Sequence, residues 1–125
     1  MEKPKMGRML WADLTVDNAD AVSDFYATVV GWEKQGLDMG GYDDYVMKET
    51  ESGEGISGVC HARGANSNIP PQWLLYVTVP DLDKSLEDCL KLGGKMIGDK
   101  RKMGPNGTYC LIQDPAGAYM MLCGE

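Results

Sequence analysis

The chemistry open to this chain is limited first by one histidine and four cysteines. His61 follows Cys60 directly, and adjacent residues of a strand point to opposite faces of a sheet, so these two side chains do not form a Cys-His nucleophile pair. No Ser-His-Asp arrangement is readable either. The cysteines lack a Cys-x-x-Cys spacing, which argues against a zinc knuckle or a redox pair. We therefore expect all four to be reduced residues of the core: Cys60, Cys89, Cys110 and Cys123.

Charge and hydropathy exclude several classes of partner. The formal net charge is −7 and the pI is about 4.6, whereas nucleic acids and anionic membranes are bound by basic surfaces. No apolar run reaches the roughly 18 residues that span a bilayer, and residues 1–5 lack the apolar core of a secretion signal. We expect a cytoplasmic protein with no nucleic-acid or membrane partner. The basic residues in the second half, Lys95, Lys100, Arg101 and Lys102, are interpreted as a solvated strand face.

The elements that must position any site come from an internal repeat. Residues 11–20 resemble residues 74–83, about 63 positions later, and Thr15 matches Thr78 at the offset at which Gly31 matches Gly94. The repeat predicts two equivalent half-domains. At 125 residues the chain is long enough to bury a core as one domain. The predicted domain spans 1–125, with module one at about 8–63, a linker at 64–72 and module two at about 73–123.

Each half shows the pattern of a strand, a helix and three further strands. Alternation predicts a strand over 9–16, and Asn18 or Asp20 then caps a helix that stops at Gly31. The expected buried stripe of this helix comprises Ala19, Val22, Phe25, Tyr26, Val29 and Val30. In the second half, Asp83 is expected to cap a helix that buries Leu82, Leu86, Cys89 and Leu90. The remaining strands are expected near 31–37, 42–48, 55–62, 73–79, 95–101, 108–113 and 118–123. The predicted class is α+β, with two βαβββ modules.

Several motifs in this order resemble a known family. They are Trp11-x-Asp13-Leu14, Phe25-Tyr26 with Gly31-Trp32, Pro70-Pro71-x-Trp73, Gly93-Gly94, and Asp114-Pro115-x-Gly117-Ala118. Paired βαβββ modules with these motifs resemble the vicinal oxygen chelate superfamily, which includes glyoxalase I, bleomycin resistance proteins and extradiol dioxygenases. The match covers about 8–123 and looks most like an uncharacterised glyoxalase-like branch. The resemblance implies a cupped mixed sheet, the glyoxalase/bleomycin resistance/dioxygenase fold.

The resemblance also implies four positions for metal ligands, and this chain departs from the pattern at three of them. The carried-over positions fall on Trp11, Leu74 and Met121, whose indole, aliphatic and thioether groups do not bind a hard divalent cation. The fourth falls on His61 or Glu54, and His61 is the only weak metal candidate. We predict no cofactor, with a divalent metal as the alternative.

If the resemblance holds, alternation gives the side chains that line the cup. Leu10, Ala12, Leu14, Val16, Leu75, Val77 and Val79 would lie against the helices. The expected ligand-binding residues are Trp11, Asp13, Leu74, Tyr76, Thr78, Tyr119 and Met121, with Thr15 and Cys123 on the same face. Aromatic rings, a thioether and a few polar groups suit a planar or aromatic organic ligand.

Asp13 is the candidate catalytic residue. A partly desolvated carboxylate beside Trp11 and Thr15 would have a raised pKa and could act as a base or as an anchor for a ligand donor. Alternatively it accepts hydrogen bonds from the backbone or a tyrosine and organises the sheet, as buried polar groups usually do. Residues 42–45 lie at a hairpin mouth, and they either gate the cup or form an exposed turn.

Three functions from different classes remain open. The first is a metal-free protein that binds a small molecule, as antibiotic-sequestering proteins do. The second is an enzyme of the same superfamily, a lyase, isomerase or dioxygenase-related protein that uses Asp13 or Tyr76. The third is an interaction module. We expect a two-fold homodimer, the commonest closed assembly.

Overall fold

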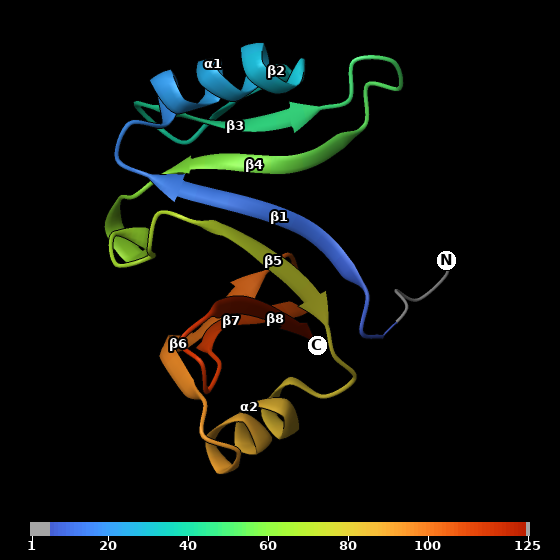
Figure 1. The fold of residues 1–125 in the computed structure, drawn as a ribbon, viewed down its shortest axis with the longest axis vertical. Helices are drawn as coiled ribbons and strands as arrows, with labels where there is room; N and C mark the ends of the chain where they lie inside the picture. Colours follow the sequence, from blue (N-terminus) through green and yellow to red (C-terminus); the bar gives the residue numbers. More distant parts are fainter. Residues whose placement is uncertain (1–5, 125) are drawn as a thin grey trace. The chain divides into compact units, whose positions relative to one another are not determined.

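A computed structural model describes residues 6–124. The first half runs in the predicted order of one strand, one helix and three strands (Figure 1). Its elements are β1 (Met9–Val16), α1 (Ala19–Val30), β2 (Glu33–Asp38), β3 (Asp43–Lys48) and β4 (Gly55–His61). A short 3-10 helix, η1 (Gly64–Asn66), follows in the segment expected to be a linker.

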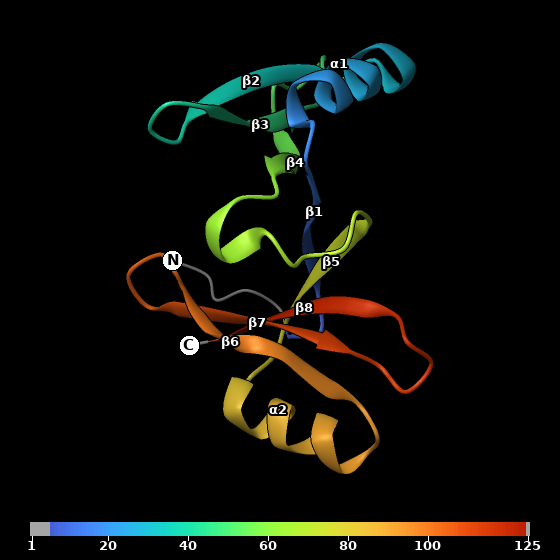
Figure 2. The same ribbon diagram turned by 90° about the vertical axis from the view of Figure 1, so that its left-hand side faces the viewer.

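The second half repeats this order (Figure 2). Its elements are β5 (Trp73–Thr78), α2 (Leu82–Lys91), β6 (Lys95–Met103), β7 (Gly107–Gln113) and β8 (Tyr119–Gly124). The predicted α+β class with two βαβββ modules is therefore confirmed. Neither helix within residues 6–124 is long and apolar enough to cross a membrane.

The chain divides into two compact units. The first unit comprises residues 12–73, and the second comprises residues 6–11 together with residues 74–124. In the first unit the strand order is β2-β3-β4-β1, where β1 and β4 are parallel and the other pairs antiparallel. In the second unit the order is β5-β8-β7-β6, where only β5 and β8 are parallel. The repeat thus produces the same topology twice.

In the first unit α1 covers one face of the sheet. Ala19, Met47 and Val59 are fully buried there, and an aromatic cluster of Tyr26, Trp32 and Trp73 packs against them. Trp73 of the Pro-Pro-x-Trp motif donates its indole N–H to the Tyr26 hydroxyl at 3.2 Å.

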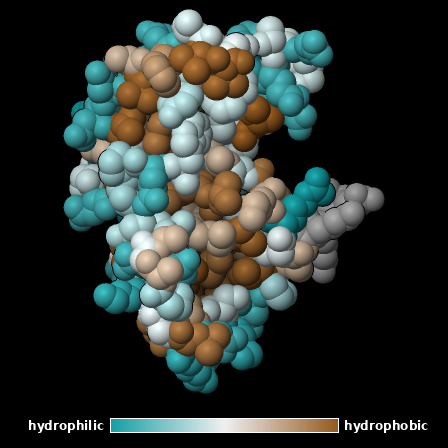
Figure 3. Space-filling model, in the orientation of Figure 1, coloured by the Kyte–Doolittle hydropathy of each residue, from teal (hydrophilic) through white to brown (hydrophobic). Residues whose placement is uncertain are grey.

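The predicted buried stripe of α1 is wrong in its outer half. Phe25 is 56% exposed and Val29 is 63% exposed, and Val30 is also exposed. The inner half is right: Ala19 is fully buried, and Val22 and Tyr26 pack against the core. Ser23, which the prediction omitted, is also buried and donates to the Asp20 carbonyl at 2.9 Å. Hydrophobic surface is therefore visible over α1 at the top of the view (Figure 3). The stop at Gly31, in the left-handed conformation with φ of 87°, is confirmed.

In the second unit α2 packs on one face of its sheet through Leu82 and Leu86, which contact Cys110 and Leu122. Two details of the prediction are wrong here. Leu90 is exposed, because it lies on the outer side of a short helix. The N-cap is Asp81, not Asp83, and its side chain accepts from the Lys84 N–H at 3.1 Å.

The four cysteines are free. Cys110 and Cys123 are buried, as expected for core residues, whereas Cys60 and Cys89 are only half-buried. Burial raises the pKa of the Cys123 thiol to about 11.

Candidate functional site

The sheet of the second unit has one face that α2 does not cover. Because Cys110 and Leu122 contact α2, their neighbours along β7 and β8 point to the opposite face. Tyr76 pairs in register with Met121, and Met121 pairs with Leu111, so these three side chains lie side by side. We call this surface the open face of the second unit.

An aromatic pair stands on this open face. The ring centroids of Tyr76 and Tyr109 are 6.2 Å apart with an interplanar angle of 40°, and Tyr109 pairs in register with Cys123. Both tyrosines are half-buried. The partly exposed rings offer a flat, polarisable surface with phenol groups at its edge.

The predicted ligand-binding residues of the second unit differ in their exposure. By strand alternation Leu74, Tyr76 and Thr78 share one face of β5, and Tyr119 and Met121 share one face of β8. Leu74 and Met121 are only 1% and 2% exposed, and Thr78 is also buried, whereas Tyr76 and Tyr119 are half-buried. A ligand would therefore meet the tyrosines first.

Trp11 also belongs to the second unit. The chain just before it runs beside β5, where the Gly7 N–H donates to the Thr78 carbonyl at 2.7 Å and the Thr78 N–H donates to the Arg8 carbonyl at 3.1 Å. Trp11 is half-buried and has interactions within the chain. The role in ligand binding assigned to it from the sequence stays a prediction.

Two residues of the open face were missed by sequence reasoning. Tyr109 lies on β7, where the apolar alternation of residues 107–113 already separates Tyr109 and Leu111 from Cys110 and Ile112. Arg101 on β6 was interpreted as part of a solvated basic cluster, but it is half-buried and pairs in register with Tyr109. Its neighbour Lys100 is paired with the Asp83 carboxylate of α2 at 2.5 Å. Alternation could have found Tyr109, whereas the register of Arg101 depends on a bulge.

Asp13 lies on the face of the first unit opposite α1. It pairs with Gly58, and its neighbour Thr15 pairs with Cys60. Burial raises the pKa of the Cys60 thiol well above its usual value, and the carboxylates of Asp13 and Asp44 raise it further. Asp13 is half-buried and takes part in interactions within the chain. Its predicted catalytic role stays a prediction.

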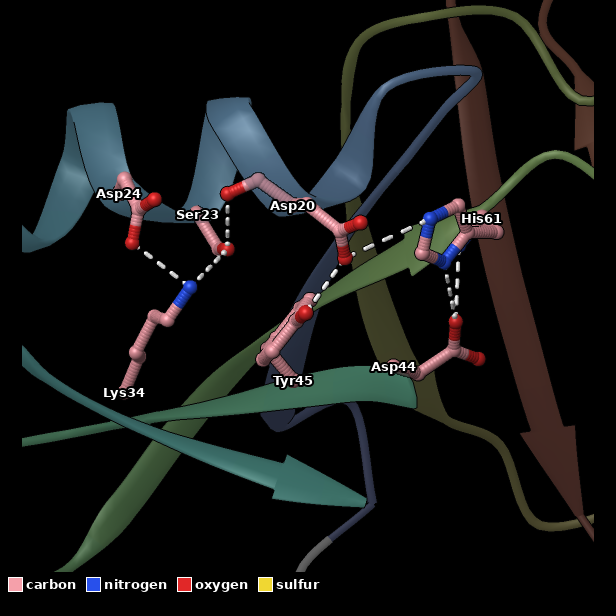
Figure 4. A network of polar contacts seen from close by, with 7 residues as sticks. All are labelled: Asp20, Ser23, Asp24, Lys34, Asp44, Tyr45 and His61. Carbon is pink, nitrogen blue, oxygen red and sulfur yellow. Dashed lines mark hydrogen bonds and ion pairs between the residues drawn. The ribbon is translucent and has the colours of Figure 1, made fainter. Parts of the chain in front are cut away.

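His61 belongs to a polar network of the first unit in which Asp20 contacts both His61 and Tyr45 (Figure 4). Asp44 is only 7% exposed, and its Oδ1 accepts from the His61 backbone N–H at 2.9 Å and lies 3.3 Å from His61 Nδ1. On the other side of the ring, His61 Nε2 lies 3.7 Å from Asp20 Oδ1. Both ring nitrogens therefore face carboxylates, which is an arrangement that fixes the imidazole.

Tyr45 extends this network toward the start of α1. Its hydroxyl donates to Asp20, and this hydrogen bond is the main reason that the pKa of Tyr45 is raised to about 12. Lys34 lies over the Tyr45 ring at 4.3 Å from its centroid and pairs with Asp24 at 2.6 Å. The network connects β3, β4, α1 and β2, so its evident effect is to fasten the helix to the sheet.

The hairpin mouth at 42–45 is not simply an exposed turn. Asp43 begins β3 and Asp44 is buried, which corrects the exposed-turn interpretation. Tyr42 packs edge-on against the His61 ring with centroids 5.3 Å apart, and the Arg63 guanidinium lies 3.9 Å from the Tyr42 centroid. A shallow hollow of about 510 Å³ opens beside them, lined by Asp20, Asp38, Gly41, Tyr42, Asp43 and Tyr45.

The residues at three of the four metal positions that the resemblance implies do not fit a divalent ion. Trp11, Leu74 and Met121 offer no imidazole or carboxylate, and Leu74 and Met121 are buried. Among residues 6–124, no group of three or more histidine, cysteine, aspartate or glutamate side chains is arranged to hold a metal. His61, the weak candidate, is instead engaged by Asp44 and Asp20.

The family follows from a direct comparison. The sequence model of the Glyoxalase/Bleomycin resistance protein/Dioxygenase superfamily matches residues 8–122. The chain belongs to this superfamily, as its motifs predicted.

Individual relatives are more distant. A protein named putative glyoxylase CFP32, from Mycobacterium bovis, is 27% identical over 119 residues, which are 94% of this chain and 46% of that protein. The anthracycline biosynthesis protein DnrV of Streptomyces peucetius is 25% identical over 112 residues, which are 90% of this chain and 39% of that protein. The chain thus spans less than half the length of these curated relatives.

Solved structures support the fold. A superfamily member from Vibrio splendidus superposes with a TM-score of 0.62 at 10% identity, and the match covers 96% of this chain and 100% of that one. At this identity the likeness concerns the fold alone.

Proposed function

We propose that this chain binds a small planar or aromatic organic molecule on the open face of the second unit, without a resident metal. The observation that carries the proposal is the half-buried Tyr76 and Tyr109 pair beside Met121. Aromatic rings stack on planar ligands, and phenol hydroxyls supply the few hydrogen bonds that orient such ligands. The name of DnrV, a protein of anthracycline biosynthesis, is consistent with a polycyclic aromatic ligand class.

A thermal-shift titration with 2-naphthamide, a neutral planar probe, tests the proposal. A bound probe stabilises the folded chain, so its melting temperature rises with probe concentration. Tyr109→Ala should abolish most of this rise, and Tyr109→Phe, which keeps the ring, should retain it. Tyr42→Ala, in the first unit, is the matched control and should behave as the wild type. An equal rise in wild type and Tyr109→Ala would refute the proposed surface.

The metal-free part of the proposal has its own test. Purified protein should contain no stoichiometric nickel, zinc, manganese or iron, and EDTA should not change its stability or its binding of 2-naphthamide. Stoichiometric metal that is lost on His61→Ala substitution would support the alternative, a metal-dependent enzyme of the superfamily.

A second candidate function is an enzyme that uses Asp13 as a base. The observation that favours it is the half-buried Asp13 carboxylate, whose charge is felt by the Cys60 thiol. Asp13→Asn should then abolish turnover of a substrate while the melting temperature and 2-naphthamide binding stay unchanged. A loss of stability with no change in turnover would instead assign Asp13 a structural role.

We also propose that two copies form a homodimer. One feature supports it: α1 exposes the apolar side chains of Phe25, Val29 and Val30. Light scattering should give twice the 13.7 kDa mass of the chain at micromolar concentration. Phe25→Asp should shift it toward the monomer, whereas Leu92→Asp, at another exposed apolar residue, should not. A monomeric wild type would contradict the proposal.

A further inference from the structure

Strand β6 contains an irregularity that changes which residue stands beside the tyrosine pair. Lys95, Met96 and Ile97 pair with Gln113, Ile112 and Leu111 in an unbroken antiparallel register. The register then shifts by two residues, and pairing resumes with Arg101 opposite Tyr109. Gly98, in the left-handed conformation with φ of 78°, begins this bulge.

The shift reverses the charge beside Tyr109. Ile97 pairs with Leu111, and in an uninterrupted antiparallel ladder the residue two positions after Ile97 would pair with the residue two positions before Leu111. Asp99 would then stand opposite Tyr109. The bulge removes Asp99 from the ladder and brings Arg101 to that position. Directly opposed residues share a face, so Arg101 emerges on the open face with Tyr109.

The open face is otherwise poor in charge. Among its residues that pair in register on β5 to β8, the charged ones are Arg101 and Lys95, and none is acidic. This is unexpected in a chain with 19 acidic and 12 basic residues. The neighbouring cation Lys100 pairs with Asp83 of α2, and this contact raises the pKa of Lys100. Arg101 is the cation that pairs in register with Tyr109.

We propose that the open face selects anionic aromatic ligands, with the ligand ring against Tyr76 and Tyr109 and its carboxylate or phenolate paired with Arg101. This inference rests on the proposed function and names its ligand class. A guanidinium has five N–H donors in a plane, so Arg101 can keep its interactions within the chain and still donate to a ligand. Half-burial of Arg101 strengthens such a pair relative to one in water.

A matched pair of probes tests the inference: 2-naphthoate, which is anionic, and 2-naphthamide, which has the same rings without the charge. In isothermal titration calorimetry the wild type should bind 2-naphthoate at least about tenfold more tightly than 2-naphthamide. Arg101→Gln should remove this preference, because it weakens 2-naphthoate binding by at least about tenfold more than 2-naphthamide binding. Arg101→Lys should retain part of the preference, because it keeps the charge but loses the planar geometry.

Lys102→Gln is the control variant. It removes the same charge from the adjacent position of β6, which is exposed and points to the other face, so the preference should persist. If the wild type binds both probes with equal affinity, the inference is overturned, but the proposed function is supported because 2-naphthamide still binds. A wild type that binds neither probe overturns both. A preference lost equally in Arg101→Gln and Lys102→Gln reflects net charge alone and also overturns the inference.

Discussion

The two units have the same order of elements but opposite chemistry on the faces that their helices leave uncovered. In the first unit this face carries Asp13 and Asp44, whose carboxylates lie near the Cys60 thiol. In the second unit it carries Tyr76, Tyr109 and Arg101, with no acidic residue in register. The topology therefore does not determine which side chains a face presents. Each unit has to be considered separately when a function is assigned.

The helices differ in a similar way. α1 is held by the small residues Ala19 and Ser23, and a polar network through Asp20 supplements this packing. α2 buries Leu82 and Leu86 against its sheet, and the Asp81 cap closes its first turn. We expect substitutions to have different consequences in the two units for this reason.

The largest expected effect is the loss of a core side chain in either unit. Leu82→Ala in the second unit and Met47→Ala in the first should each lower the free energy of unfolding by about 2–5 kcal/mol, because both side chains are fully buried. Leu90→Ala, at an exposed position of α2, should change it by less than about 0.5 kcal/mol. Urea unfolding measures all three. A single shifted transition in both core variants would show that the units unfold together, and two transitions would show that they do not.

The next effect concerns the buried carboxylate of the first unit. Asp44→Ala leaves the His61 backbone N–H without its acceptor and should cost about 1–3 kcal/mol in chemical denaturation. Asp43→Ala removes an exposed neighbouring carboxylate and is the control. If the two variants were equally stable, the hydrogen bond from the His61 backbone N–H to Asp44 would not contribute to stability as the structure indicates.

A smaller effect separates the two helix starts. Asp81→Ala should destabilise the protein by about 1 kcal/mol, because its side chain caps the Lys84 N–H. Asn18 occupies the same position before α1 but makes no side-chain capping hydrogen bond, so Asn18→Ala should change the melting temperature very little. Equal losses in the two variants would contradict this difference.

The smallest expected effect is a loss of stability at alkaline pH. The Tyr45 hydroxyl donates to Asp20 only while it is protonated, and its pKa is raised from the usual 10 to about 12. This contribution to stability is therefore complete below pH 10 and is lost as the pH rises through about 12. In a spectrophotometric titration, the phenolate band that appears near pH 12 should be missing in Tyr45→Phe. Asp20→Asn should move that band to lower pH, and an unchanged titration would contradict the assigned cause.

Local signals in the sequence were sufficient for the fold. Strict alternation in 9–16 and 73–79, the stop at Gly31 and the offset that relates Thr15 to Thr78 predicted both βαβββ modules. These signals depend on short-range backbone preferences, which each segment carries by itself. Helix burial was less predictable, since Phe25 and Leu90 have the right spacing for a buried stripe but lie at its outer edge.

The candidate site was predicted only in part. Tyr76 and Met121 were placed on one face by strand parity, and their register pairing bears out that they are neighbours. Arg101 was not predicted, because its position depends on a register shift between β6 and β7 that no single segment encodes. The contacts of His61 with Asp44 and Asp20 were missed because they join residues that are 17 and 41 positions apart in the sequence.

The irregularity in β6 lies in an edge strand of the sheet, so insertions and deletions there are tolerated more readily than changes in the core. A relative whose β6 runs without the bulge would present a carboxylate, not a guanidinium, to whatever rests on its tyrosines. Such a relative would prefer cationic ligands, where this chain would prefer anionic ones. A change in the length of one strand would then alter ligand preference while the rest of the fold stays the same.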